Sequence, residues 1–215
     1  PKTLFGHGFW TIDGEKISKS KGNAISPAKL AQDLSDESGA SREVCLDAVR
    51  YFVAREVTFG MDGDFSFKSF RNRFNSDLAN DLGNLLNRTL SMLGKYFDGA
   101  IADPKGFSGG LESVIKATST SAKDACDRLD FTRALESIWQ MIGTANKYIN
   151  DTEPWTLAKN NETDELAGVL YSALEVARAA AILISPFMPA TACEIARQLG
   201  IGETFASLKW ADATA

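Results

Sequence analysis

Three lysines fall within a six-residue stretch near the start of the chain, interleaved with serines and followed by a glycine. The stretch reads Lys16-Ile17-Ser18-Lys19-Ser20-Lys21-Gly22-Asn23. A cationic loop with hydroxyl and backbone donors, placed ahead of a helix N-terminus, suits a polyphosphate. When a carboxylate attacks the α-phosphate of ATP, fixed cations stabilise the charge that builds on the phosphate oxygens and on departing pyrophosphate. A lysine–serine loop is also commonly just a solvated surface loop, so the pattern alone leaves both interpretations open.

The elements that must position this loop can be predicted from local signals. A β-like run at residues 8–12 precedes it, and Ser26 with Pro27 behind it predicts a capped helix start, because proline at the first helical position loses no needed donor. A second helix is expected over residues 42–57. Its apolar face would be formed by Cys45, Val49, Phe52 and Val53. Turn residues at 60–65 leave room for another short strand.

Beyond residue 65 the apolar residues recur at the helical period. The expected helices cover residues 67–97, 111–128, 131–149, 163–184 and 189–199. Thr163 is predicted to cap the fourth of these, which should stop at Ser185-Pro186. The fold class predicted is therefore mainly α: a small mixed α/β connecting domain over residues 1–64, followed by an all-α bundle over residues 65–215.

Composition narrows the classes of protein and site. A net charge of -5 argues against a protein that coats nucleic acid with its whole surface, so any RNA contact should be local. The longest apolar stretch, residues 166–184, carries Glu175 and Arg178 and is interpreted as a buried helix, with no membrane partner expected. A start at Pro1, without a signal segment, is typical of a piece cut from a longer protein. We expect the three cysteines, Cys45, Cys126 and Cys193, to be small buried side chains in a reducing cytoplasm, and we expect no metal site.

Three other polar residues invite a functional interpretation that we consider weaker than a structural one. His7, the sequence's single histidine, has no carboxylate motif beside it and is expected to be structural. Asp62 and Asp64 are spaced like a metal pair, but without a third ligand they are typical of a turn.

The lysine loop resembles the Lys-Met-Ser-Lys-Ser signature of class I aminoacyl-tRNA synthetases, including the Ser-x-Gly-Asn tail and a proline four residues after the asparagine. Ile17 replaces the methionine, which leaves an apolar residue of similar volume and the same charges. The resemblance implies that Lys16 and Lys19 are catalytic, and that Lys16, Ser18, Lys19 and Ser20 bind ATP. It also implies ATP with Mg²⁺ as the cofactor of the full-length enzyme.

Two further segments narrow the resemblance to methionyl-tRNA synthetases. Residues 6–11 resemble the strand that enters the loop in that family, and residues 80–88 with residues 146–155 resemble its helical anticodon-binding domain. The connecting domain would then be the family's stem-contact domain. The resemblance implies that Asn84, Arg88 and Trp155 contact the CAU anticodon of tRNA-Met.

These three residue types suit RNA recognition. Asn84 and Arg88 lie four residues apart, so on a helix they share a face and offer an amide and a guanidinium fork to a base edge. Trp155 could stack an unpaired base. Each has an ordinary alternative, because tryptophan after proline commonly packs in a core and an Asn–Arg pair is commonly an exposed helix face. Lys68, Arg71, Arg73, Lys147 and Lys159 are further candidates for RNA backbone contact.

The resemblance implies the C-terminal part of a cytoplasmic methionine–tRNA ligase, with tRNA-Met, ATP and, in the full-length enzyme, methionine as partners. The isolated chain should be inactive, since the nucleotide-binding half with its His-Ile-Gly-His signature is not in this sequence. Two alternatives stay open. One is a stand-alone helical RNA-binding module, and the other is a class I synthetase for another aliphatic amino acid or for cysteine.

Overall fold

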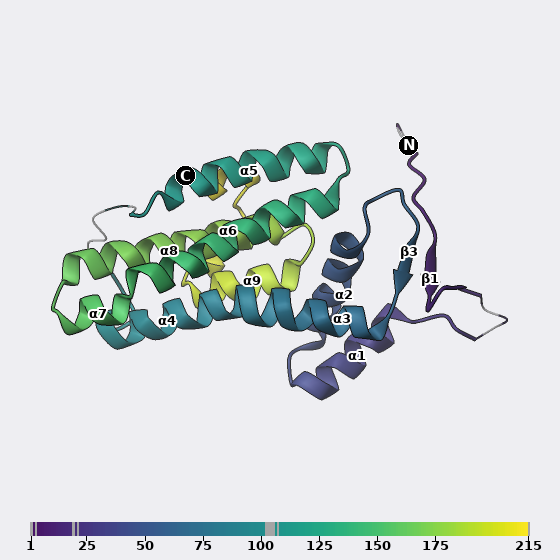
Figure 1. Ribbon diagram of the computed structural model, residues 1–215, viewed down its shortest axis with the longest axis horizontal. Coiled ribbons are helices and arrows are strands. Elements are labelled where there is room, and N and C mark those ends of the chain that lie inside the picture. The colour runs from purple at the N-terminus through teal and green to yellow at the C-terminus, as the bar shows by residue number, and fades with distance from the viewer. Residues whose placement is uncertain are drawn as a thin grey trace.

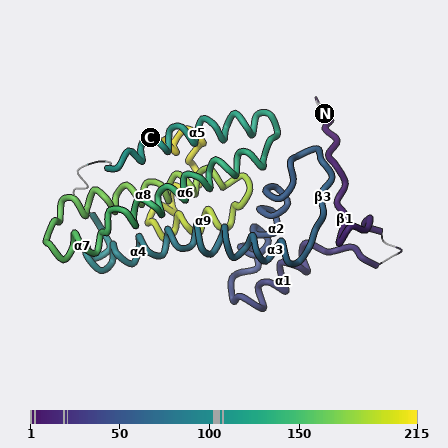
Figure 2. Tube along the Cα trace, viewed as in Figure 1, coloured from purple at the N-terminus to yellow at the C-terminus, as the bar shows by residue number. Residues whose placement is uncertain are grey.

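The structure, a computed structural model, describes residues 2, 4–18, 20, 22–101, 106 and 108–214. It is elongated, with a small sheet at one end and a helical bundle at the other (Figure 1). The chain leaves the sheet, returns to it once, and then stays in the bundle to its end (Figure 2). The predicted class, a small mixed α/β part followed by a helical bundle, is confirmed.

The sheet has three short strands in the order β2-β1-β3. They are β1 (Trp10–Ile12), β2 (Glu15–Lys16) and β3 (Gly63–Phe65). β1 pairs antiparallel with β2 and parallel with β3, so both predicted strand regions are confirmed, whereas β2 was not predicted. Asp13 and Gly14 join β1 to β2 with φ of 50° and 78°, the two left-handed residues of a tight hairpin turn.

Two helices follow the sheet's first two strands. Pro27 opens α1 (Pro27–Ser38), and the Ser26 side chain accepts a hydrogen bond from the Lys29 backbone N–H, as predicted. The second is α2 (Arg42–Glu56), within a residue of its predicted end. Val53 lies on the same face of α2 as Val49, with which it lines one pocket, but it is 47% exposed, whereas Cys45, Val49 and Phe52 are buried.

One long helical rod carries the chain from the sheet into the bundle. It consists of α3 (Phe67–Arg73), the π-helix η1 (Phe74–Gly83) and α4 (Asn84–Phe97), where a single regular helix was expected. Side-chain donors from another helix hold two carbonyls of the π segment: the indole N–H of Trp139 donates to the Asp77 carbonyl at 3.1 Å, and Asn146 donates to the Asp81 carbonyl at 2.9 Å. Such insertions of side chains into the helical ladder are a usual cause of departures from the α-helix.

The remaining bundle helices largely follow the predicted spans. They are α5 (Leu111–Asp127), α6 (Phe131–Thr152), α7 (Pro154–Lys159), α8 (Thr163–Ile184), α9 (Pro189–Gln198), α10 (Gly202–Phe205) and the 3₁₀ turn η2 (Trp210–Thr214). The short α7, α10 and η2 were not predicted. Thr163 is the first residue of α8 and not its cap, because Glu162 occupies that position without a side-chain hydrogen bond.

α8 is long and apolar enough in composition to cross a membrane, yet 78% of its most apolar window is buried inside the protein. That agrees with the interpretation of residues 166–184 as a core helix. Of the cysteines, Cys45 is buried as expected and Cys126 is half-buried, but Cys193 is exposed, so the expectation of burial was wrong there.

α2 contributes to both hydrophobic cores. Cys45, Val49 and Phe52 belong to a small core with Phe65 and Phe70, whereas Tyr51 belongs to the main core of the bundle. The predicted division between residues 64 and 65 falls after α2, a helix that contributes side chains to both cores. Phe65 and Phe70, which come after the division, still belong to the small core.

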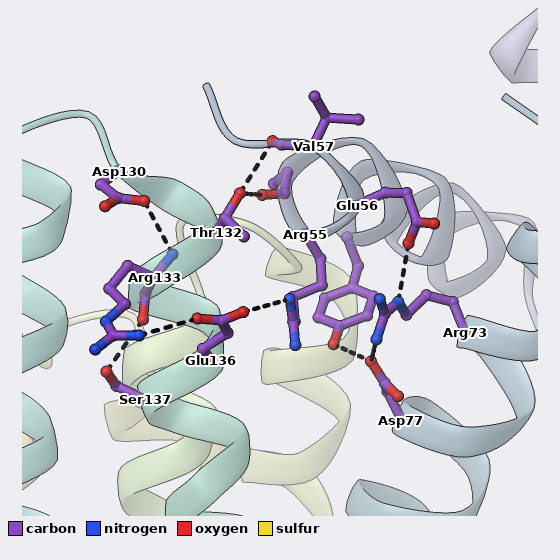
Figure 3. Close-up of polar contacts among 12 residues, drawn as sticks. Arg55, Glu56, Val57, Arg73, Asp77, Asp130, Thr132, Arg133, Glu136 and Ser137 are labelled. Atoms are coloured by element: carbon purple, nitrogen blue, oxygen red, sulfur yellow. Dashed lines mark hydrogen bonds and ion pairs between the residues drawn. The ribbon is translucent and has the colours of Figure 1, made fainter. Parts of the chain in front are cut away.

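Polar contacts tie α2 to α6 and to the rod (Figure 3). Arg55 forms an ion pair with Glu136 of α6 at 3.1 Å. On the neighbouring turn, Tyr51 donates a hydrogen bond to the buried carboxylate of Asp77 at 2.7 Å, and Arg73 contacts the same carboxylate at 3.2 Å. Burial first, and then the hydrogen bond and charge of Asp77, raise the pKa of the Tyr51 hydroxyl above its usual range, so this hydroxyl stays protonated.

α2 also holds the corner between α8 and α9. Asp47, buried to 2% exposure, accepts from the Thr191 backbone N–H at 2.7 Å, in the first turn of α9. Arg50 donates to the carbonyls of Phe187 and Pro186 at 2.8 and 3.0 Å. A carboxylate at a helix N-terminus and a guanidinium on carbonyls that follow a helix C-terminus both match the helix dipoles, so this corner is firmly anchored.

Candidate functional site

The lysine loop leaves the β1–β2 hairpin and is closed by an asparagine. The Asn23 side chain accepts from the Ser18 backbone N–H at 2.9 Å and donates to the Lys16 carbonyl at 3.2 Å. The Asn23 amide therefore holds the end of the loop against its beginning at residues 16 and 18. Sequence reasoning had recorded Asn23 only as part of the signature's tail, although asparagine is a usual closer of such loops.

Two of the four predicted ATP-binding side chains meet in this loop. The hydroxyls of Ser18 and Ser20 lie 2.8 Å apart, and Ser20 is exposed. Lys16 is exposed, with its ammonium 5.7 Å from the centre of the Phe9 ring. Lys19, the other predicted catalytic lysine, lies outside the described residues. The described part of the loop thus presents the Ser20 hydroxyl and the Lys16 side chain to solvent, with the Ser18 hydroxyl beside them.

The two aspartates beside the sheet hold the hairpin. Asp64 accepts from the Thr11 hydroxyl at 2.5 Å and from the Gly14 backbone N–H at 2.8 Å, and these two hydrogen bonds lower the pKa of its carboxyl. Asp62 accepts from the Phe9 backbone N–H at 2.7 Å. Within the described residues no group of three or more histidines, cysteines or acidic residues could hold a metal ion. The Nδ1 of His7 contacts the neighbouring Gly8 carbonyl at 2.7 Å.

The other predicted site lies in the bundle, away from the sheet, on α4, α6 and α7 (Figure 1). Asn84 and Arg88 lie one turn apart on α4, and each contacts an asparagine of α6. Asn84 donates to Asn146 at 3.4 Å, and Arg88 donates to Asn150 at 2.8 Å. Both pairs are separated by the same number of residues, so α4 and α6 run in the same direction with two polar rungs between them.

Trp155 completes this cluster from the first turn of α7. Its side chain is 45% exposed, and the Arg88 guanidinium carbon lies 6.0 Å from the centre of its ring. The contact is within the range of a cation–π interaction. The structure therefore brings together all three residues that sequence reasoning assigned to RNA, and the tryptophan is not a core residue.

Sequence reasoning missed Asn146 and Asn150 as members of the cluster. A signal was present, because they repeat on α6 the four-residue spacing of Asn84 and Arg88 on α4. For several of the other candidate cations the structure shows partners within the protein. Arg71 pairs with Glu37 at 2.9 Å, Arg73 with Glu56 and Asp77, and Lys147 with Asp151. Lys68 and Lys159 are exposed.

Two protein-family models match the chain. Residues 1–90 match a family described as class I tRNA synthetases (M), and residues 108–215 match the anticodon binding domain of methionyl tRNA ligase. The chain belongs to the methionyl-tRNA synthetase family. Both ends of the molecule, the sheet with its lysine loop and the bundle with its polar cluster, fall within matched regions of this family.

Curated members of the family are similar over nearly the whole chain. Methionine–tRNA ligase of Caldanaerobacter subterraneus is 46% identical over 217 residues, which cover 98% of this chain and 32% of that protein. The Bacillus subtilis enzyme is 43% identical over 221 residues, covering 100% and 32%. The chain spans about a third of the length of the curated methionyl-tRNA synthetases it matches.

Solved structures of the family share the fold. Mycobacterium tuberculosis methionyl-tRNA synthetase in complex with methionyl-adenylate superposes with a TM-score of 0.76 and 39% identity, covering 91% of this chain and 38% of that one. The free form of the same enzyme gives a TM-score of 0.74 at 33% identity, covering 94% and 40%.

Proposed function

We propose that this chain is the part of a cytoplasmic methionine–tRNA ligase that recognises the anticodon of tRNA-Met and carries the ATP-contacting loop of the KMSKS type. The polar cluster of Asn84, Arg88 and Trp155 is the observation that carries the anticodon role. An amide, a guanidinium and an exposed indole converge from two helices, and this is the set of groups that reads an unstacked base. The exposed face of Trp155 accepts a base by stacking.

In the same proposal the lysine loop acts on ATP. Lys16 and Lys19 stabilise the charge on the phosphates while the methionine carboxylate attacks the α-phosphate and pyrophosphate departs, and Ser18 and Ser20 hydrogen-bond the phosphate oxygens. The hydroxyls already face one another in a loop closed by Asn23, which supports this role. Mg²⁺ would enter bound to the ATP phosphates, because Asp62 and Asp64 beside the loop already accept hydrogen bonds that hold the hairpin.

The full reaction, attachment of methionine to tRNA-Met, also needs the nucleotide-binding half that binds methionine and adenine. The His-Ile-Gly-His signature of that half does not occur in this sequence. We therefore expect the chain by itself to bind tRNA and to be inactive in adenylation.

The experiment that tests the anticodon role is RNA binding by Trp155→Ala. With a stem-loop bearing the CAU anticodon, the loss of one base stack should weaken binding by about 1–3 kcal/mol. Phe67→Ala is the matched control, because Phe67 is likewise an exposed aromatic residue, 53% exposed, and it lies at the start of α3, far along the rod from the cluster. Affinities are compared at the same salt concentration, because phosphate contacts are salt-dependent. Equal affinity of Trp155→Ala and wild type would refute the assignment.

A further inference from the structure

The Asn146 amide sits between a group that can only accept a hydrogen bond and the Asn84 side chain. Its Nδ2 donates to the Asp81 backbone carbonyl at 2.9 Å, and its Oδ1 faces Asn84 Nδ2 at 3.4 Å. The nitrogen and oxygen of an amide are assigned from their partners, and a carbonyl leaves no choice. The Asp81 carbonyl therefore fixes which end of the Asn146 amide faces Asn84.

That orientation is passed on to Asn84. If the Asn84 amide were turned over, its Oδ1 would face the Asn146 Oδ1, and two acceptors would lie against each other without a proton between them. The observed orientation avoids this contact. Because the bond from Asn84 to Asn146 is long, it biases the amide without locking it. The consequence is directional: Asn84 points its nitrogen into the protein and keeps its oxygen for a ligand.

Arg88 supplies the complementary chemistry one turn further along α4. Its guanidinium is held by the Asn150 oxygen at 2.8 Å and lies over the Trp155 ring, and guanidinium groups only donate. The cluster thus offers an acceptor from Asn84 beside donors from Arg88. Cytosine has the matching edge, because its 4-amino group donates and its N3 and O2 accept, whereas uracil carries a carbonyl oxygen at that position.

We propose that Asn146 is a positioning residue for specificity: by biasing the Asn84 amide to turn its oxygen outward, it makes this cluster prefer an RNA base with an exocyclic amine, cytosine, over uracil. The inference rests on the proposed function, since it specifies which base the anticodon cluster selects. Asn146 itself does not touch the base. It acts through Asn84, and its own orientation comes from the π segment of the rod.

The test measures binding of two RNA stem-loops, with CAU and UAU anticodons, to the wild-type chain and to variants at matched salt. Wild type should prefer the CAU loop, and Asn146→Ala should lower this preference by about 10-fold, because one oriented hydrogen bond to a base edge is lost. The loss should come from weaker binding of CAU, with UAU binding nearly unchanged. Asn87→Ala, on an exposed neighbouring position of α4, should leave both affinities as they are.

A second variant separates positioning from simple damage to the fold. Asn146→Asp keeps an oxygen for Asn84 Nδ2 and loses the donor to the Asp81 carbonyl, so it should be less stable yet retain the preference for CAU over UAU. An Asn146→Ala preference equal to that of wild type would overturn the inference, as would an equal loss of affinity for both loops. If wild type does not discriminate the CAU loop from stem-loops with unrelated anticodons, the proposed function itself fails. If wild type selects CAU over those but not over UAU, only this inference fails.

Discussion

Replacing Tyr51 with phenylalanine isolates one buried hydroxyl at the junction of α2, the rod and α6. Tyr51 is 1% exposed, and its ring packs on Trp139 with centroids 4.4 Å apart, a contact that Tyr51→Phe preserves. What disappears is the 2.7 Å hydrogen bond to the Asp77 carboxylate. The Asp77 carboxylate still accepts hydrogen bonds from Arg73 and from the Ser76 hydroxyl, so it is not left without a partner in the variant.

A hydrogen bond to a charged group contributes about 1.5–3 kcal/mol, so we expect Tyr51→Phe to lower the free energy of unfolding by about 2 kcal/mol. For a chain of this size that is a fall of roughly 4–8 °C in Tm. Urea unfolding followed by circular dichroism, and by the fluorescence of tryptophans that include Trp139, measures the change with two probes. Tyr96→Phe is the control, because the described residues provide no hydrogen bond to its hydroxyl.

A double-mutant cycle sharpens the result. In an Asp77→Ala background the Tyr51 hydroxyl has lost its acceptor, so Tyr51→Phe should then cost almost nothing, and the coupling energy should be about 2 kcal/mol. The reasoning is refuted if the free energy of unfolding of Tyr51→Phe lies within about 0.5 kcal/mol of the wild-type value, which is the usual effect of a substitution that removes no specific interaction.

Two more substitutions probe the α9 anchor and the lysine loop. Asp47→Ala removes the carboxylate that serves the N-terminus of α9 and should lower stability by about 1–2 kcal/mol, with faster amide exchange in α9. Exposed Asp36 on α1 is the control, and unaltered exchange in α9 would contradict the capping role. In the full-length enzyme, Lys19→Ala should lower methionine-dependent pyrophosphate exchange by about 100-fold or more with the fold intact, since a preorganised charge on the transition state is lost. Lys29→Ala, outside the loop, should behave as wild type, and an unchanged exchange rate in Lys19→Ala would exclude the proposed catalytic role.

Features set by neighbours in sequence were predictable. Ser26 and Pro27 predicted the start of α1 correctly, because both act on backbone groups within one turn of the helix. Two local signals were available and unused: Asp13-Gly14 is a typical two-residue hairpin turn, and Pro154 stands at the first position of the short helix α7. Each signal would have predicted an element, β2 or α7, that is too short to show a helical or strand periodicity.

Features set by distant residues were not predictable. The π segment is held by Trp139 and Asn146, which lie on a helix that begins about fifty residues after the segment ends. The four-residue spacing of Asn84 and Arg88 predicted a shared face, and the resemblance to the family added Trp155. The partners on α6 depend on the register between two helices, and no spacing within either helix contains that register.

The rod from Phe67 to Phe97 gives the molecule a fixed length. The rod starts one residue after β3, the strand that pairs with β1 of the β1–β2 hairpin, and it ends in the bundle. Its three helical segments follow one another without a break. The polar cluster lies on the rod itself, at Asn84 and Arg88. At about 1.5 Å per residue, with somewhat less in the π segment, the part of the rod from Phe67 to Arg88 spans roughly 30 Å. If the proposed function holds, this part of the rod sets the distance between the ATP-contacting loop and the anticodon cluster: every residue gained or lost in it would move the two sites apart or together by about 1.5 Å and rotate them by about 100° relative to each other. Selection of the substrate by its overall dimensions would then belong to the backbone of the rod, independently of the bases that the side chains contact.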